Sequence, residues 1–164
     1  MVKVHNVRLI VDNQSGISMK YENDWFDSGR LADTYSWPDT IENGQKMDIL
    51  CYERDWALAG CSGYVQYSMN KMLVTFAFSN PSVGTNKLGV DTSARVWDNM
   101  SDHNYSSFDV NLRIGDLPLK CRCSCTAGST NTATVKIAGQ GQQTRLPSSG
   151  HKIVDNFELR VSIE

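Results

Sequence analysis

Apolar and polar residues alternate along much of the chain. Stretches that alternate in this way cover 7–12, 110–114, 133–137 and 157–163. A period of two residues is typical of a β-strand with one buried face and one face in water. Two further runs, 47–52 and 72–78, are apolar on both faces and predict strands in the middle of a sheet. The pattern therefore predicts a protein built almost entirely of strands.

Turn-forming residues separate these stretches at short intervals. Asn, Asp, Gly, Pro and Ser cluster at 12–16, 42–45, 79–84, 127–131 and 147–150. About ten strands at this spacing are typical of an antiparallel β-sandwich. No repeat or linker divides the chain, so we expect a single all-β domain over residues 1–164.

One segment, 93–108, departs from the strand pattern. Its bulky residues fall on one helical face: Trp97, Met100, Tyr105 and Phe108. Residues 91–93 are Asp, Thr and Ser, which are common helix caps. We therefore expect one or two short helices flanking the sandwich, one of them between 91 and 108.

The tryptophans differ in their position relative to the predicted strands. Trp56, like Tyr64, lies near a predicted strand and is expected in the core. Trp25 and Trp37 flank turns and are the better candidates for the surface.

Charge and hydropathy exclude two classes of protein. Sixteen basic and eighteen acidic residues give a net charge of −2, so we expect no nucleic-acid partner. No apolar run approaches the roughly 18 residues of a membrane helix. The first residues do not have the pattern of a signal peptide. We expect synthesis in the cytosol and action on target membranes or glycans after release, with secretion and removal of a leader as the alternative.

Candidate catalytic and metal-binding residues are few. Cys121, Cys123 and Cys125 occupy alternate positions, which would place them on one strand face as buried thiols. A metal or redox site is the alternative, but zinc sites favour Cys-x2-Cys spacing with a second ligand pair. The histidines have no evident partner for acid–base or nucleophilic chemistry. They are His5, His103 and His151. We therefore expect no enzymatic activity, no metal and no cofactor.

Six short motifs follow one another in the order found in a known family. They are 10–16, Phe26-Asp27-Ser28-Gly29, Pro38 with Ile41 and Gly44, 59–69, Leu73–Pro81, and Ser148-Ser149-Gly150-His151. Together they resemble the actinoporins, the cytolysins of sea anemones, over residues 7–90 and 148–164. The resemblance implies a non-enzymatic β-sandwich with two flanking helices. Such proteins bind membranes, prefer sphingomyelin, and form pores with an N-terminal amphipathic helix.

The resemblance also implies a binding site for the phosphocholine head group. Carried over by motif, Ser28, Ser62, Ser79 and Pro81 would line it. Hydroxyls can bond phosphate oxygens, and a trimethylammonium group needs aromatic faces. The predicted helix is expected to supply the apolar wall, from Trp97, Tyr105 or Phe108.

Two departures from the family change the expected activity. The loop at 82–88, which is rich in aromatic residues in the family, contains no Trp or Tyr here. Only six residues precede Val7, where the family has its pore-forming helix. We therefore expect a membrane-active toxin or defence protein that binds lipid without strong lysis. A glycan-binding lectin of the fungal fruit-body type, which shares this sandwich, is the alternative, and a homo-oligomer fits either interpretation.

Overall fold

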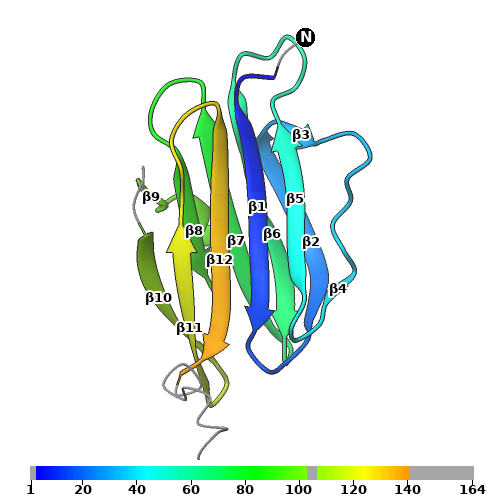
Figure 1. Cartoon of the computed structure of the whole chain (residues 1–164), viewed down its shortest axis with the longest axis vertical. Helices are drawn as coiled ribbons and strands as arrows, with labels where there is room; N and C mark the ends of the chain where they lie inside the picture. Colours follow the sequence, from blue (N-terminus) through cyan, green and yellow to red (C-terminus); the bar gives the residue numbers. More distant parts are fainter. Residues whose placement is uncertain (1–2, 103–106, 141–164) are drawn as a thin grey trace, which may run out of the picture.

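The computed structural model describes residues 3–102 and 107–140. These residues form two facing six-stranded β-sheets (Figure 1). The strands are β1 (Asn6–Gln14), β2 (Met19–Ser28), β3 (Arg30–Leu31), β4 (Thr40–Ile41), β5 (Lys46–Tyr52), β6 (Gly60–Met69), β7 (Met72–Pro81), β8 (Lys87–Asp91), β9 (Ser101–Asp102), β10 (Ser107–Ile114), β11 (Leu117–Ser124) and β12 (Thr130–Gly139). The first sheet has the order β10-β11-β12-β1-β5-β3, and the second has β4-β2-β6-β7-β8-β9. The predicted all-β sandwich is confirmed.

Nearly all neighbouring strands are antiparallel, but β1 and β12 run parallel. Their pairing begins with Asn6 opposite Thr130 and ends with Gln14 opposite Ala138. This pair differs from the purely antiparallel expectation. Its cause is the path of the chain, because β12 enters the sheet at the end of the sandwich where β1 also begins (Figure 1). β1 therefore lies between β12 and β5 and pairs on both edges.

The core lies between the sheets and is formed by the apolar half of each alternating strand. In β1, the side chains of Val7, Leu9 and Val11 are fully buried, as the alternation over 7–12 predicts. β7 is buried on both faces from Val74 to Asn80 because it lies between β6 and β8 and is covered from outside. The prediction of a central strand at 72–78 is therefore confirmed.

The cysteines at 121, 123 and 125 lie in and just after β11, and all three side chains are buried. Burial raises the pKa of the Cys123 thiol to about 12 and that of Cys125 to about 11. These groups are therefore neutral thiols at physiological pH, and the expectation of one buried strand face is confirmed.

The short helix predicted between 91 and 108 is present, but it covers only a small part of that range. Only Ala94–Trp97 is helical, as a single 3-10 turn, η1, with the Ser93 hydroxyl accepting a 3.2 Å hydrogen bond from the Arg95 amide. Ser101–Asp102 pairs with β8, and Phe108 belongs to β10, where it pairs with Cys123. Phe108 is the first bulky residue of an alternating stretch that runs to Ile114. This stretch pairs with β11 as a strand, and that pairing overrides the helical spacing. No helix in residues 3–102 and 107–140 is long and apolar enough to cross a membrane.

Two of the expectations for aromatic burial are reversed. Trp56, expected in the core, is 84% exposed, whereas Trp37, expected at the surface, is buried and packs near Phe78. Trp25 is exposed as expected, and Tyr64 is half-buried. Several sequence-based expectations lie outside the described residues. They concern Tyr105, His103, His151, the motif at 148–151 and the strand at 157–163.

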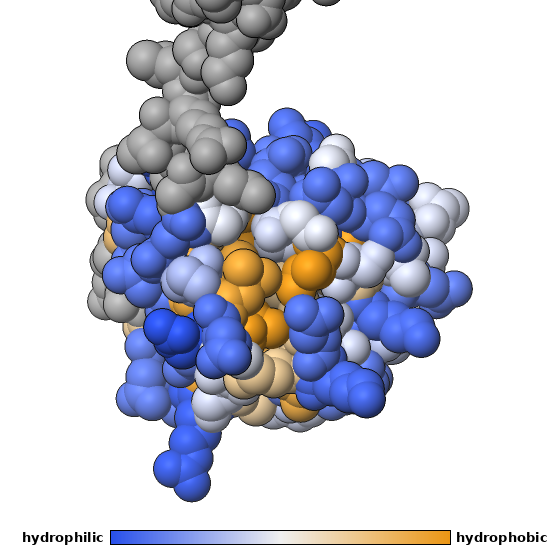
Figure 2. Space-filling model, turned by 90° about the horizontal axis from the view of Figure 1, so that it is seen from below, coloured by the Kyte–Doolittle hydropathy of each residue, from blue (hydrophilic) through white to orange (hydrophobic). Residues whose placement is uncertain are grey.

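The end of the sandwich opposite the N-terminus has a central group of hydrophobic atoms ringed by polar residues (Figure 2). The β6–β7 hairpin turns there through Asn70 and Lys71, which both have positive φ, the conformation of a tight two-residue turn. Met72 and Leu73 after this turn are 37% and 40% exposed. The Gly115 amide lies 3.0 Å from the Met72 sulfur, so the hairpin contacts the β10–β11 turn.

Candidate functional site

Three serines from distant parts of the chain lie in one row across the second sheet. Ser62 in β6 pairs with Ser28 in β2 on one side and with Ser79 in β7 on the other. Paired residues in antiparallel strands direct their side chains to the same face. The neighbours Cys61 and Phe78 are buried in the core, so the row lies on the outer face of the sheet. We call these three residues the serine row.

The 3-10 turn η1 covers part of this outer face. The Trp97 indole N–H donates a 2.9 Å hydrogen bond to the Ser62 hydroxyl oxygen. Gly89 in β8 makes room for the turn, since a Cβ there would lie 2.7 Å from a Val96 methyl carbon. This cover explains why Ser62 and Ser79 are only 7% and 6% exposed although they are on the outer face.

Three aromatic rings border the serine row. Trp25 in β2 lies beside Tyr64 of β6, with ring centroids 5.5 Å apart. Trp25 also meets Trp97 edge to face at 4.9 Å. Trp25 is 40% exposed, so part of its ring is accessible from solvent. We call Trp25, Tyr64 and Trp97 the aromatic cluster.

The predicted apolar wall is only partly assembled. Trp97 lies against the serine row, as stated above. Phe108 does not, because it lies in β10 of the first sheet and packs against the core between the sheets. Tyr105 lies outside the described residues. The sequence did not indicate that Tyr64 and Trp25 belong to this wall. Both lie beside the serine row because the register of β2 and β6 pairs them with each other.

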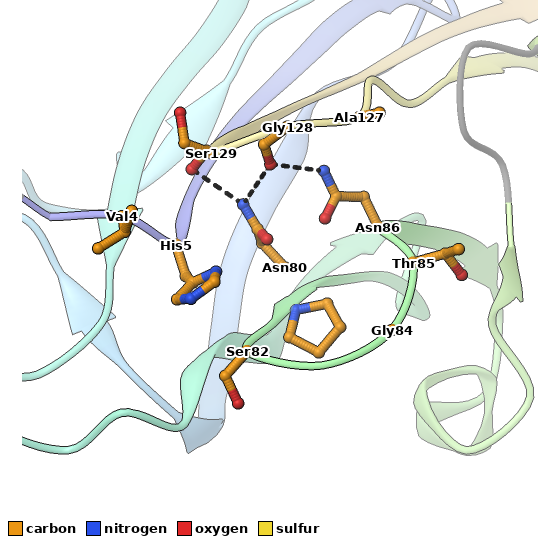
Figure 3. A pocket seen from close by; sticks show the side chains of 11 residues that line it. Val4, His5, Asn80, Ser82, Gly84, Thr85, Asn86, Ala127, Gly128 and Ser129 are labelled. Carbon is orange, nitrogen blue, oxygen red and sulfur yellow. Dashed lines mark hydrogen bonds between the residues drawn. The ribbon is translucent and has the colours of Figure 1, made fainter.

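Pro81 is on the same strand as Ser79 but does not join the serine row, contrary to the expectation of one shared site, and borders a cavity at the end of the strand instead. It pairs with Gly60, where a Cβ would lie 2.4 Å from the Asn80 carbonyl oxygen, so only glycine allows this close approach. The cavity, which we call the rim pocket, has a volume of about 350 Å³ (Figure 3). Its lining residues are Val4, His5, Asn80, Pro81, Ser82, Gly84, Thr85, Asn86, Ala127, Gly128 and Ser129.

Buried amides hold the loops that form the rim pocket. The Asn80 amide donates to the carbonyl oxygens of Asn6, at 2.8 Å, and Ser129, at 3.0 Å. The Asn86 amide donates to the carbonyl oxygens of Thr126, at 2.6 Å, and Gly128, at 3.3 Å (Figure 3). The pocket lining has no carboxylate, ammonium or guanidinium group. Its side chains include the His5 imidazole, the amides of Asn80 and Asn86, and several hydroxyl groups, which can all form hydrogen bonds.

The sequence signal for these asparagines was weak. Asn80 precedes Pro81 in a stretch that indicates a turn, and turn asparagines are ordinarily exposed. Here Asn80 and Asn86 are 2% and 5% exposed, because their amides donate to backbone carbonyls of a loop 49 and 40 positions away in the chain. Only the folded arrangement of these loops identifies them.

This fold is shared with several solved structures. The lipid-binding protein Nakanori is 19% identical and has a TM-score of 0.65, over 85% of this chain and 72% of that one. The RahU protein, in complex with a TRIS molecule, is 10% identical with a TM-score of 0.52, over 84% and 97%. The lectin XCL of Xerocomus chrysenteron, in a mutated form, is 16% identical with a TM-score of 0.51, over 81% and 97%.

These likenesses, all below 20% identity, establish the fold alone. No protein-family model and no curated protein sequence matches the chain. The chain therefore shares an all-β sandwich fold with these solved structures.

Proposed function

We propose that this chain is a non-enzymatic lipid-binding protein that recognises the phosphocholine head group, as in sphingomyelin, at the serine row. The observation that carries the proposal is the pairing of Ser28, Ser62 and Ser79 beside an exposed tryptophan ring. A phosphate needs several hydrogen-bond donors, and a quaternary ammonium group needs an aromatic face. The serine row and the aromatic cluster provide both on one surface.

Each residue has a separate role in this proposal. The Ser62 hydroxyl already accepts from Trp97 and lies 3.4 Å from the Phe78 carbonyl oxygen, so Ser62 positions the indole. Ser28 and Ser79, on the strands to either side, donate to the phosphate oxygens. The trimethylammonium group lies over Trp25, which retains an accessible face.

Vesicle pelleting with and without sphingomyelin tests this proposal. We expect the wild-type chain to pellet with sphingomyelin vesicles and the Ser28→Ala variant to pellet less. Ser68→Ala is the matched control, because Ser68 is on the same outer face of β6 at the opposite end of the strand. Equal pelleting of the wild type and Ser28→Ala would contradict the proposed site.

The rim pocket favours a second candidate function, that of a lectin. Its polar lining offers amides, hydroxyls and backbone groups, which can form hydrogen bonds with sugar hydroxyls. A glycan array tests this function. If it is correct, Thr85→Ala lowers the array signal and Ser28→Ala does not.

A role in defence against target membranes is part of the first proposal, and it follows the resemblance described above. In that role the protein is made in the cytosol and acts after release, or is secreted after removal of a leader. A homo-oligomer is compatible with both candidate functions.

A further inference from the structure

One edge of the sandwich carries a long strand, β10. The two sheets have four edges, which are formed by β3, β4, β9 and β10. In the described part of the chain, β3, β4 and β9 have two residues each, whereas β10 has eight. β10 lies at the outer side of the first sheet, and among the described strands it pairs only with β11 (Figure 1). An edge strand of this length is a template for a further strand.

The backbone of β10 directs alternate residues toward this open edge. Arg113 lies opposite Pro118 of β11, and the Pro118 carbonyl oxygen accepts a 3.1 Å hydrogen bond from the Gln140 amide, on the side away from β10. Opposite residues that do not bond each other direct their backbone groups to opposite sides of the strand pair. The N–H and C=O groups of Arg113 therefore face the open edge. Because the ladder alternates, those of Asn111 and Asp109 face it as well.

β10 lacks the features that usually keep edge strands apart. Its residues, Ser-Phe-Asp-Val-Asn-Leu-Arg-Ile, include no proline and no lysine. Its pairing with β11 runs from Ser107 to Ile114 without a bulge. Val110 packs against the core but is only half-buried, because no described strand lies beyond it in the sheet. A further strand at this edge would complete its burial.

The charges of β10 are complementary to those of a second, antiparallel copy of β10. A two-fold axis at Asn111 places Asp109 opposite Arg113 of the second copy, and Arg113 opposite its Asp109. On the inner face, the same register places Val110 opposite Leu112. A two-fold axis at Asp109 or at Arg113 would instead place like charges opposite each other, which destabilises an antiparallel pair. The register centred on Asn111 therefore joins opposite charges on both sides of the axis.

The neighbouring charged groups leave Arg113 available for this contact. Asp109 lies 3.1 Å from Lys120 of β11. Arg113 has no ion-pair partner among the described residues, and its side chain is exposed. A carboxylate can accept from two cations, so Asp109 can keep Lys120 and also accept from Arg113 of a second copy.

We propose that β10 pairs with β10 of a second copy of this chain, about a two-fold axis at Asn111, and joins the two first sheets into one continuous sheet. The edge-facing residues exchange backbone hydrogen bonds across the axis, as in any antiparallel ladder. An interface of this symmetry closes on itself, so assembly ends at a dimer. A second copy is favoured over another extended segment because β10 complements itself in both charge and apolar spacing.

The dimer gives the serine row a second copy on the same side. A two-fold axis between antiparallel strands is perpendicular to their sheet, so both second sheets lie on one side of the joined sheet. The serine rows are on the outer faces of the second sheets and therefore face the same direction. This consequence rests on the proposed function: two head-group sites that reach one vesicle bind it more tightly than either site alone.

Sedimentation velocity over a concentration series, without lipid, tests the dimer. We expect reversible dimerisation of the wild-type chain. In the R113D variant both cross-strand pairs become repulsive, so we expect the dimer dissociation constant to rise roughly tenfold or more. D109R/R113D restores opposite charges and should recover most of the wild-type affinity. Lys136→Asp is the matched control, because Lys136 is exposed on the same sheet but lies in β12, two strands from the edge.

Two substitutions of Asn111 test the backbone pairing and the register. Asn111→Pro removes an edge-facing N–H and should prevent dimerisation with little change in the urea midpoint, since edge strands accept proline. Asn111→Cys should be joined to its second copy by a short bismaleimide, because position 111 lies on the axis. The wild type is the control for this reaction, since its five cysteines are all buried.

The outcomes separate this inference from the proposed function. A wild type that remains monomeric at every concentration would overturn the dimer and leave the edge to a different strand. Dimerisation of R113D and Asn111→Pro with wild-type affinity would place the interface elsewhere and would also overturn it. Failure of Asn111→Cys to cross-link within a dimer would refute the register. Dimerisation of a chain that does not bind phosphocholine would leave the interface standing and refute only the head-group site.

Discussion

The indole N–H of Trp97 and the hydroxyl oxygen of Ser62 are 2.9 Å apart, although 35 positions separate the two residues in the chain. This hydrogen bond fixes η1 on the outer face of the second sheet and places an aromatic ring against the serine row. The bond links η1, the only helical element in residues 3–102 and 107–140, to the candidate site.

Trp97→Phe tests the importance of this bond for stability. The variant retains an aromatic ring but loses the donor, and a typical intramolecular hydrogen bond contributes about 1 kcal/mol. We therefore expect the free energy of unfolding to fall by about 1 kcal/mol. Urea denaturation measures the change, with Trp25→Phe as the control for the loss of an indole on the same face. Equal stability of Trp97→Phe and the wild type would show that η1 is held by packing alone.

Ser79→Ala tests the head-group site. Loss of one hydrogen bond to a charged group costs about 1.5–3 kcal/mol, so we expect phosphocholine binding to weaken roughly ten- to a hundredfold. The fold should be retained, because the backbone carbonyl of Ser79, which accepts from Asn131, is unchanged. Isothermal titration with phosphocholine provides the measurement. Wild-type affinity in the Ser79→Ala variant would remove Ser79 from the site.

Asn131→Ala tests the anchoring of the loops around the rim pocket. The fully buried Asn131 amide donates to the Ser79 carbonyl oxygen at 2.9 Å and to the Lys87 carbonyl oxygen at 3.0 Å. Its removal leaves two buried acceptors without these donors, so we expect a loss of about 3 kcal/mol in unfolding free energy. Asn111→Ala is the exposed control and should change stability by less than about 0.5 kcal/mol. Similar losses in both variants would contradict the structural role of Asn131.

Alkaline pH should destabilise the fold. Burial raises the pKa of Cys123 to about 12 and of Cys125 to about 11, from an ordinary value of 9.0. Ionisation therefore favours the unfolded chain: stability is full below about pH 9 and is lost as the pH rises through the folded-state values. Urea midpoints at about pH 8 and about pH 11 measure the loss. The C123A/C125A variant should show a shallower decline, and an identical decline would assign the effect to other groups.

The local sequence pattern determined the strand content and the core. Alternation over 7–12 and 133–137 predicted strands with one buried face, because side chains of a strand point alternately to its two faces whatever it pairs with. The same argument placed the three cysteines of 121–125 on one buried face. Motif order placed Ser28, Ser62, Ser79 and Pro81 in one site. The structure pairs the three serines, whereas Pro81 borders the rim pocket.

Tertiary structure alone decided the properties that depend on partners distant in the chain. The helical spacing of 93–108 failed because Phe108 gains more from pairing in β10 than from a short isolated helix. Trp56 is exposed and Trp37 buried because loop paths, not distance from a strand, set their burial. The serine row and the rim pocket both form where strands separated by many residues begin or end together. Strand register and loop placement are long-range properties, so no local pattern could have specified them.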